Sequence, residues 1–271
     1  MSRPEHLAPP DIFYNEDEAR KYTCNSRIIE IQTKMCERAL ELLLLPENES
    51  CLLLDIGCGS GLSGEVLEEH GHTWIGIDIS RAMLDIAKKR EVEGDVILSD
   101  MGQGLPFRAG QFDGVVSISA LQWLCNLDNS RHGLRKRLDV FFSSLFACLK
   151  NGARAVFQFY PENDDQLNLL ESAACKAGFS GGRMIDFPNS KKARKVFLVL
   201  MTGGVTTVPV DSLAQQNRCT VGKNMKNKNG KKDPLRGTRR DWIMKKKDRF
   251  RNKNKEVKAD SKYTGRKRSR F

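Results

Sequence analysis

The sequence lacks the patterns that mark metal sites, disulfide scaffolds and membrane anchors. Its eight cysteines are scattered singly, with no CxxC pair and no Cys/His cluster at zinc-binding spacing, so we expect reduced thiols and no metal site. The longest apolar runs, at residues 42–45 and 196–201, are far too short to span a bilayer, and the polar start of the chain contains no apolar secretion segment. These absences predict a soluble, intracellular protein with no membrane anchor.

Excess positive charge is absent from most of the chain and is concentrated at its end. Residues 221–271 contain 21 Lys or Arg and five Asp or Glu, a net charge of +16, so residues 1–220 carry −5 of the total of +11. A mildly acidic body with a basic arm predicts a polyanionic partner. The arm interleaves its cations with Trp242, Phe250 and Tyr263, which favours RNA bound through phosphates and stacked bases. A tail that only keeps the protein soluble is the alternative.

Between residues 25 and 201, short apolar runs alternate with stretches of helical periodicity. We expect strands over 51–56, 73–78, 95–99, 112–119 and 153–160, and helices over 25–45, 61–70, 80–90, 133–150 and 164–178. This alternation is typical of a mostly parallel sheet with helices on both faces. Two final strands, around 183–187 and 195–201, follow each other without a helix and predict an antiparallel hairpin at the sheet edge.

Composition divides the chain into three parts. Residues 1–24 form an N-terminal segment, residues 25–204 an α/β domain, and residues 205–271 a basic tail that we expect to be disordered in isolation. Within the tail, residues 239–252 have some amphipathic spacing and could become helical on a partner.

The strongest motif lies at residues 52–61, which read LLLDIGCGSG. An apolar strand ends in Asp55, and the turn after it places glycine at positions 57, 59 and 61, where the backbone can approach a ligand closely. The motif resembles the first motif of class I methyltransferases, whose turn holds the methionine end of S-adenosylmethionine. Residues 59–64 also satisfy the GxGxxG pattern of dinucleotide-binding proteins, but Asp55 would repel a pyrophosphate and attract an ammonium group.

Two further acids follow the second and third predicted strands. Asp78, followed by Ile79, is placed to accept hydrogen bonds from both hydroxyls of a ribose, although it could instead cap the next helix. In class I methyltransferases the position of Asp100 and Met101 usually binds the adenine, although here a solvated loop acid is the alternative.

The fourth predicted strand should end beneath the transferable methyl group. Its exit, from Ser117 to Trp123, contains neither the Asp/Asn-Pro-Pro-aromatic motif of amine methylation nor the Pro-Cys pair of pyrimidine-carbon methylation. Guanine N7 needs neither kind of activation, because its in-plane lone pair is already nucleophilic. Trp123 is a candidate stacking surface for the base, and ordinary core packing is equally open.

The whole chain resembles the eukaryotic guanine-N7 methyltransferases of small-subunit (18S) ribosomal RNA, the Bud-site-selection or Williams–Beuren-region family. The likeness rests on the segments DIGCGSGLSG, DMGQGLPF, FDGVVSISALQWLCN, FQFYPEN and the closing YTGRKR. It implies a class I, Rossmann-like fold with a seven-stranded, mostly parallel sheet in the order 3-2-1-4-5-7-6. It also implies methylation of one guanine in pre-ribosomal RNA during maturation of the small subunit.

The motifs and the resemblance together give the expected site. Cofactor binding is expected at Asp55, Gly57, Cys58, Gly59, Gly61, Asp78, Ile79, Asp100, Met101 and Ser117, and acceptor positioning at Ser119, Gln122 and Trp123, with no general base.

The resemblance further implies a partner, a small zinc-binding activator protein that forms a heterodimer by extending the sheet at the edge strand 95–99. Basic clusters at residues 245–247 and 266–268 predict nuclear localisation, in nucleolus or nucleoplasm, with a cytoplasmic location also open.

Two other functions stay open at this point. The chain could act chiefly as a ribosome-assembly factor whose catalysis is dispensable, or it could methylate another RNA or a small molecule.

Overall fold

The computed structural model describes residues 3–125, 133–190 and 193–203, together with residues 244, 247, 251, 259 and 260. The chain divides into two units, Met1–Val208 and Pro209–Phe271. The first unit contains the sheet and the site discussed below. In the second, Met244, Lys247 and Arg251 are helical, and the remainder of the predicted tail helix lies outside the described residues.

A seven-stranded sheet in the order β3-β2-β1-β4-β5-β7-β6 forms the centre of the first unit. The strands are β1 (Leu52–Ile56), β2 (Thr73–Asp78), β3 (Asp95–Leu98), β4 (Phe112–Ile118), β5 (Leu149–Phe159), β6 (Ser180–Asp186) and β7 (Lys195–Met201). Strands β1 to β5 are parallel to one another, whereas β7 is antiparallel to both β5 and β6. The predicted fold class, strand order and edge hairpin are therefore confirmed.

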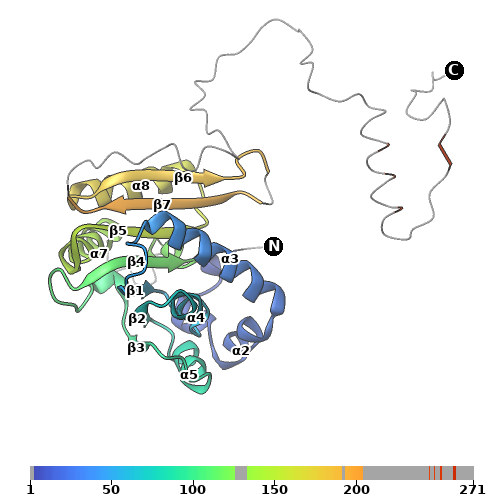
Figure 1. Cartoon of the computed structure of the whole chain (residues 1–271), viewed down its shortest axis with the longest axis horizontal. Coiled ribbons are helices and arrows are strands. Elements are labelled where there is room, and N and C mark those ends of the chain that lie inside the picture. Colours follow the sequence, from blue (N-terminus) through green and yellow to red (C-terminus); the bar gives the residue numbers. More distant parts are fainter. Residues whose placement is uncertain are drawn as a thin grey trace, which may run out of the picture. The chain divides into compact units, whose positions relative to one another are not determined.

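Helices cover both faces of this sheet (Figure 1). One core cluster joins the sheet to α6 (Leu121–Leu124), α7 (Leu134–Cys148) and α8 (Asp164–Lys176), and the other joins it to α3 (Ser26–Leu43), α4 (Leu62–Glu69) and α5 (Arg81–Lys89). The inward positions are Leu, Ile, Val and Phe on strands that are buried on both sides, as expected for parallel strands between two helical layers.

The N-terminal segment is folded more extensively than its polar sequence indicates. It contains the 3-10 turn η1 (Pro4–His6), the short α1 (Pro10–Phe13) and the nine-residue α2 (Glu16–Cys24), none of which was predicted. The Asn15 side chain caps α2 by accepting from the backbone N–H groups of Asp17 and Glu18. The helix packs against α3 and α5 and buries Ala19 completely. Tertiary packing rather than periodicity stabilises this short helix.

Other differences from the predicted elements are small and have local causes. Strand β5 begins at Leu149 instead of residue 153, because Leu149 pairs with Phe112 ahead of a bulge in the β4–β5 ladder. Within the described part of the chain, no helix is long and apolar enough to cross a membrane. The same residues contain no group of three or more His, Cys, Asp or Glu that could hold a metal ion.

Candidate active site

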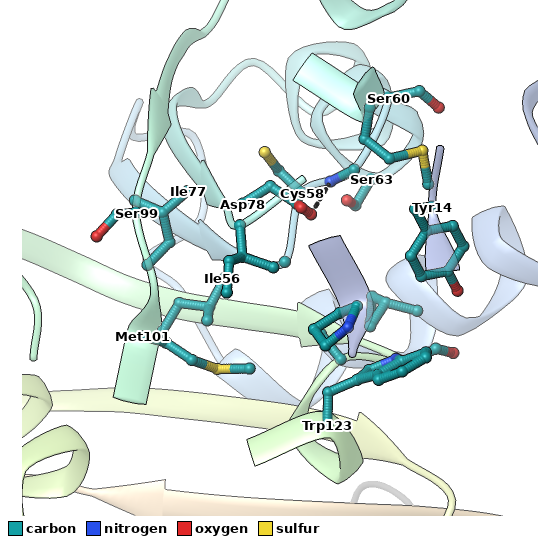
Figure 2. A pocket seen from close by; sticks show the side chains of 18 of the residues that line it. Tyr14, Ile56, Cys58, Ser60, Ser63, Ile77, Asp78, Ser99, Met101 and Trp123 are labelled. Carbon is teal, nitrogen blue, oxygen red and sulfur yellow. Dashed lines mark hydrogen bonds between the residues drawn. The ribbon is translucent and has the colours of Figure 1, made fainter. Parts of the chain in front are cut away.

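A cleft opens at the carboxyl ends of the central strands, where the strand order reverses between β1 and β4. This position is the usual ligand site of open α/β sheets. The cleft has an empty volume of about 870 Å³, which includes its open mouth. Figure 2 shows Ser99 and Met101 on one side of the cleft, Tyr14 and Trp123 on the other, and Asp78 between them.

The turn between β1 and α4 forms one wall. Gly57, Gly59 and Gly61 all have positive φ angles (77°, 55° and 83°), which glycine adopts without strain. A Cβ on Gly57 would lie 2.3 Å from the Cβ of Ala120, so only glycine lets β1 and the β4 exit approach this closely. The backbone N–H groups of Gly57 and Cys58 donate to the carbonyl of Ile77, and that of Gly61 donates to Cys58. The turn is therefore braced against β2.

Asp78 ends β2 on the cleft wall. Its carboxylate accepts hydrogen bonds from the backbone N–H of Gly59 (2.9 Å) and of Ser80 (2.7 Å). Burial raises the pKa of this carboxyl group, and these N–H donors oppose that effect. The alternative role as a helix cap is not observed, because Ser80 is the N-cap residue of α5 and accepts from the N–H of Met83.

Asp55 lies behind the glycine turn and does not line the cleft. It is completely buried, and its Oδ2 accepts a short hydrogen bond from the Ser63 hydroxyl, whereas Oδ1 has no partner among the described residues. Burial raises the pKa of Asp55 to about 7, against the opposing effect of the Ser63 hydrogen bond. A buried carboxylate oxygen without a partner marks a place where a nearby cation or donor would be favourable.

Asp100 and Met101 follow β3 on the far side of the cleft. The carboxylate of Asp100 caps the 3-10 turn η2 (Met101–Gln103) by accepting from Gly102 N–H (2.8 Å), and it forms a two-point ion pair with Arg137 of α7 (3.1 and 3.2 Å). Both side chains of the pair are mostly buried. The loop acid is therefore fixed in place, and the alternative of a solvated side chain does not hold. The sequence analysis did not find Arg137, which also lines the cleft.

Aromatic residues from the N-terminal segment form another wall of the cleft. Tyr14 and Tyr22 line the cleft, and the Tyr14 carbonyl accepts from the hydroxyl of Ser80 at 2.9 Å. Trp123 has only 6% of its surface exposed, and its ring lies 5.8 Å from Phe13 and 5.7 Å from Tyr14 between centroids. Trp123 is therefore both a packed side chain and part of the cleft wall. Only the tertiary fold brings the N-terminal segment here, because its aromatic residues have no motif context.

The β4 exit turns sharply at Ser119, whose φ angle of 60° is unusual for a residue other than glycine. Its N–H donates to the Gln158 carbonyl (2.8 Å), its hydroxyl donates to the Gln158 side-chain oxygen (2.9 Å), and its carbonyl accepts from the Gln122 amide (2.7 Å). Two buried glutamines therefore hold this strained residue in place.

The structure thus separates the predicted residues into two sets. The cleft wall includes Gly57, Cys58, Gly59, Asp78, Ile79, Asp100, Met101, Ser119 and Trp123. The second set lies behind the wall and comprises Asp55, Gly61, Ser117 and Gln122. Ser117 is completely buried and donates to the Ile56 carbonyl at 2.7 Å, which ties β4 to β1. Residues of this second set support the wall.

The hydrogen bonds and charges of the turn bear on whether its glycine motif binds S-adenosylmethionine or a dinucleotide. The N–H groups of Gly57, Cys58, Gly59 and Gly61 all donate within the protein, so none of them is available to cradle a pyrophosphate. Two carboxyl groups, the buried Asp55 and the half-buried Asp78, flank the same turn. The turn therefore suits a ligand with an ammonium and a sulfonium group, and it does not suit a dinucleotide.

Comparisons with known proteins agree with this chemistry. Residues 54–157 match a family described as "Methyltransferase domain", and residues 204–270 match "Methyltransferase involved in Williams-Beuren syndrome". The chain is 53% identical to the 18S rRNA (guanine-N(7))-methyltransferase of Mus musculus, over 98% of this chain and 96% of that protein. The chain belongs to the 18S rRNA (guanine-N7)-methyltransferase family. The relatives and the matched domain show that this chain is an enzyme, a methyltransferase.

Solved structures share the fold of this methyltransferase family at low sequence identity. Phosphoethanolamine N-methyltransferase 2 of Haemonchus contortus, in complex with phosphomonomethylethanolamine and S-adenosylhomocysteine, has a TM-score of 0.54 and is 18% identical, over 70% of this chain and 58% of that one. A methyltransferase in complex with the Haloferax volcanii Trm112 methyltransferase activator has a TM-score of 0.50 and is 17% identical, over 69% and 98%. These two likenesses establish the class I methyltransferase fold.

Proposed function

We propose that this chain transfers a methyl group from S-adenosylmethionine to N7 of a guanine in 18S ribosomal RNA during biogenesis of the small ribosomal subunit. The observation that carries the proposal is the near full-length identity to a guanine-N7 methyltransferase of 18S rRNA. The cleft supports it through its carboxylates, its aromatic wall and the absence of a general base among the acceptor-side residues Ser119, Gln122 and Trp123.

Each cofactor group has a matching partner on the cleft wall or behind it. The carboxylate of Asp78 binds the two ribose hydroxyls, and Asp100, held by Arg137, faces the exocyclic amine of adenine. Asp55 attracts the ammonium group across the glycine turn through its unpartnered Oδ1. Met101 and Ile79 supply apolar walls for the adenosine.

Catalysis depends mainly on alignment. S-adenosylmethionine supplies an electrophilic methyl group bound to a sulfonium sulfur. The chain holds the acceptor base in line with that group, which contributes up to ~7–11 kcal/mol through orientation alone. Because guanine N7 carries no proton, no residue needs to remove one. The rigid exit at Ser119 and the ring of Trp123 position the base against the cofactor.

The decisive experiment uses the full chain co-expressed with the activator and incubated with radiolabelled S-adenosylmethionine and unmethylated pre-ribosomal particles. We expect label in 7-methylguanosine of the small-subunit rRNA and its loss in Asp78→Ala, with direct loss of cofactor binding by calorimetry. Cofactor binding without label in RNA would exclude this function and favour a role in subunit assembly.

We also propose that a small zinc-binding activator protein binds at β3. This strand is one of the two edges of the sheet, the other being β6, and it exposes 36% of Ile97 and 54% of Leu98. An unpaired edge with apolar side chains is a site for strand addition. The shared fold with a methyltransferase solved in complex with an activator supports this assignment. Val96, by contrast, packs inward against the core, so Leu98 is the better placed of the two for this contact.

The basic C-terminal residues complete the proposal. The 21 cations of residues 221–271 bind rRNA phosphates, and the clusters at 245–247 and 266–268 direct the protein to the nucleus. Residues 205–271 act as this RNA-binding and targeting tail, attached to the catalytic domain of residues 25–204 and its N-terminal segment.

A further inference from the structure

One polar side chain on the acceptor side of the cleft has no assigned role. Gln32 of α3 lines the cleft, and its amide nitrogen lies 3.5 Å from the hydroxyl oxygen of Ser119. That distance is at the outer limit of a hydrogen bond, so the amide group is only weakly engaged. Catalytic hydrogen bonds are often long before the substrate is bound and tighten in the complex.

The surroundings of Gln32 favour a donor that points toward the substrate. The hydroxyl hydrogen of Ser119 is used on the side-chain oxygen of Gln158, so Ser119 faces Gln32 as an acceptor and orients its NH₂ group. Gln32 also forms a side-chain hydrogen bond with Tyr22, and this bond partly opposes the rise that burial causes in the pKa of the Tyr22 hydroxyl group. One amide hydrogen is thus used on Tyr22, so the hydrogen that faces Ser119 at 3.5 Å is the one left to meet the substrate.

The position of this amide relative to guanine follows from the reaction. N7 and O6 are the two acceptors on one edge of guanine. With N7 directed at the methyl group above the β4 exit, O6 lies beside it on the same edge. A donor next to Ser119 is therefore placed to meet O6. Adenine has an amino group at the equivalent position, so two hydrogen-bond donors, that amino group and the Gln32 NH₂ group, would face each other without an acceptor.

We propose that Gln32 donates a hydrogen bond to O6 of the target purine and thereby selects guanine over adenine. The inference rests on the proposed function and adds a specificity-determining residue to it. Gln122 and Gln158 act as positioning residues, because they fix the strained Ser119 that in turn orients the Gln32 amide.

The test compares donors with acceptors at position 32 in the full chain, co-expressed with the activator and assayed on unmethylated pre-ribosomal particles. Gln32→Ala should lower kcat/KM about five- to tenfold, the usual effect of one lost neutral hydrogen bond. Gln32→Glu, which is isosteric but only accepts, should lower it about 100-fold because it faces O6 with a second acceptor. Gln32→Lys, a donor, should retain more activity than Gln32→Ala.

The control is Gln111→Glu, the same substitution in an exposed turn at the amino end of β4, which should keep wild-type kcat/KM. Cofactor affinity measured by calorimetry should stay within about twofold of wild type in all four variants. Wild-type activity in both Gln32→Ala and Gln32→Glu would overturn the inference and leave the proposed function standing. A parallel loss of cofactor binding in these variants would also overturn it, because Gln32 would then be structural. Failure of the wild-type chain to form 7-methylguanosine would instead exclude the proposed function.

Discussion

At the scale of single residues, a carboxyl group is buried where the sequence suggested an exposed ligand. Asp55 is the last residue but one of β1, and the motif alone indicates direct contact with the cofactor. The structure instead buries it behind the turn, where its pKa rises to about 7. Under the proposed function, the influence of Asp55 on the cofactor is therefore electrostatic, and it depends on whether the carboxyl group is ionised.

This position predicts a pH-dependent affinity for S-adenosylmethionine. An ammonium group near Asp55 favours the carboxylate, so binding lowers the pKa and releases a proton. Affinity should therefore rise about tenfold between pH 6 and pH 8 and level off above the free-state pKa of about 7. Calorimetric titration across this range checks the effect.

Two variants isolate the contribution of Asp55. Asp55→Asn should remove the pH dependence, because the amide does not titrate. Asp113→Asn is the matched control, because Asp113 lies at the amino end of β4, away from the cleft. Burial would raise the pKa of Asp113, but Lys150 and the Leu52 N–H outweigh it and lower that pKa. A flat wild-type profile between pH 6 and pH 8 would contradict the proposed role of Asp55.

At the scale of elements, the contact between η2 and α7 fixes the side of the cleft where we propose that adenine binds. A Cβ on Gly102 would lie 2.5 Å from the guanidinium of Arg137, so the guanidinium packs directly on this glycine. Gly102→Ala should displace Arg137 from Asp100 and weaken cofactor binding about three- to tenfold. This is the expected effect of losing one hydrogen bond to a charged group in a partly exposed ion pair. Isothermal titration with S-adenosylmethionine measures this.

The fold should tolerate Gly102→Ala, because Gly102 does not have a left-handed backbone conformation. Gly182→Ala provides the control, since nothing lies within 4 Å of the added methyl group and the backbone is again not left-handed. If Gly102→Ala binds the cofactor like wild type, the Asp100–Arg137 pair has no part in adenine binding.

The edge strand β3 gives a second prediction at this scale. Leu98→Lys should disrupt a strand-to-strand contact and reduce co-purification of the activator, because a charged edge residue opposes strand addition. Leu44→Lys is the matched control, with a similarly exposed leucine (50%) at the end of α3. Equal recovery of the activator with both variants would argue against the β3 contact.

At the scale of the whole molecule, the proposed function assigns different roles to the two units. The first unit holds the complete cleft, and the C-terminal residues hold the excess positive charge. A chain ending at residue 203 should therefore bind S-adenosylmethionine like the full chain but bind rRNA much more weakly. The salt dependence of RNA affinity should also become shallower, because fewer phosphates are neutralised. Filter binding at several salt concentrations checks this, and an unchanged slope would exclude the tail as the main phosphate contact.

Most of the architecture follows from local sequence patterns. Strands such as β2 and β7 agree residue for residue with the predicted ranges, because an apolar run bounded by turn residues has one favourable place between two helical layers. The glycine motif and the acids after β2 and β3 were predicted for the same reason, since parallel strands bring their carboxyl ends together at one edge.

The N-terminal wall and the supporting contacts could not be predicted in this way. Tyr14, Tyr22 and Gln32 reach the cleft only because α2 and α3 pack across it, and Arg137 reaches Asp100 from an element 37 residues further along the chain. The sequence by itself determined the sheet, the glycine turn and the type of cofactor, because these depend on short-range periodicity and backbone freedom. Only the tertiary structure decided which residues line the cleft and which lie behind its wall. Burial and long-range packing set those positions, and neither is encoded in local spacing.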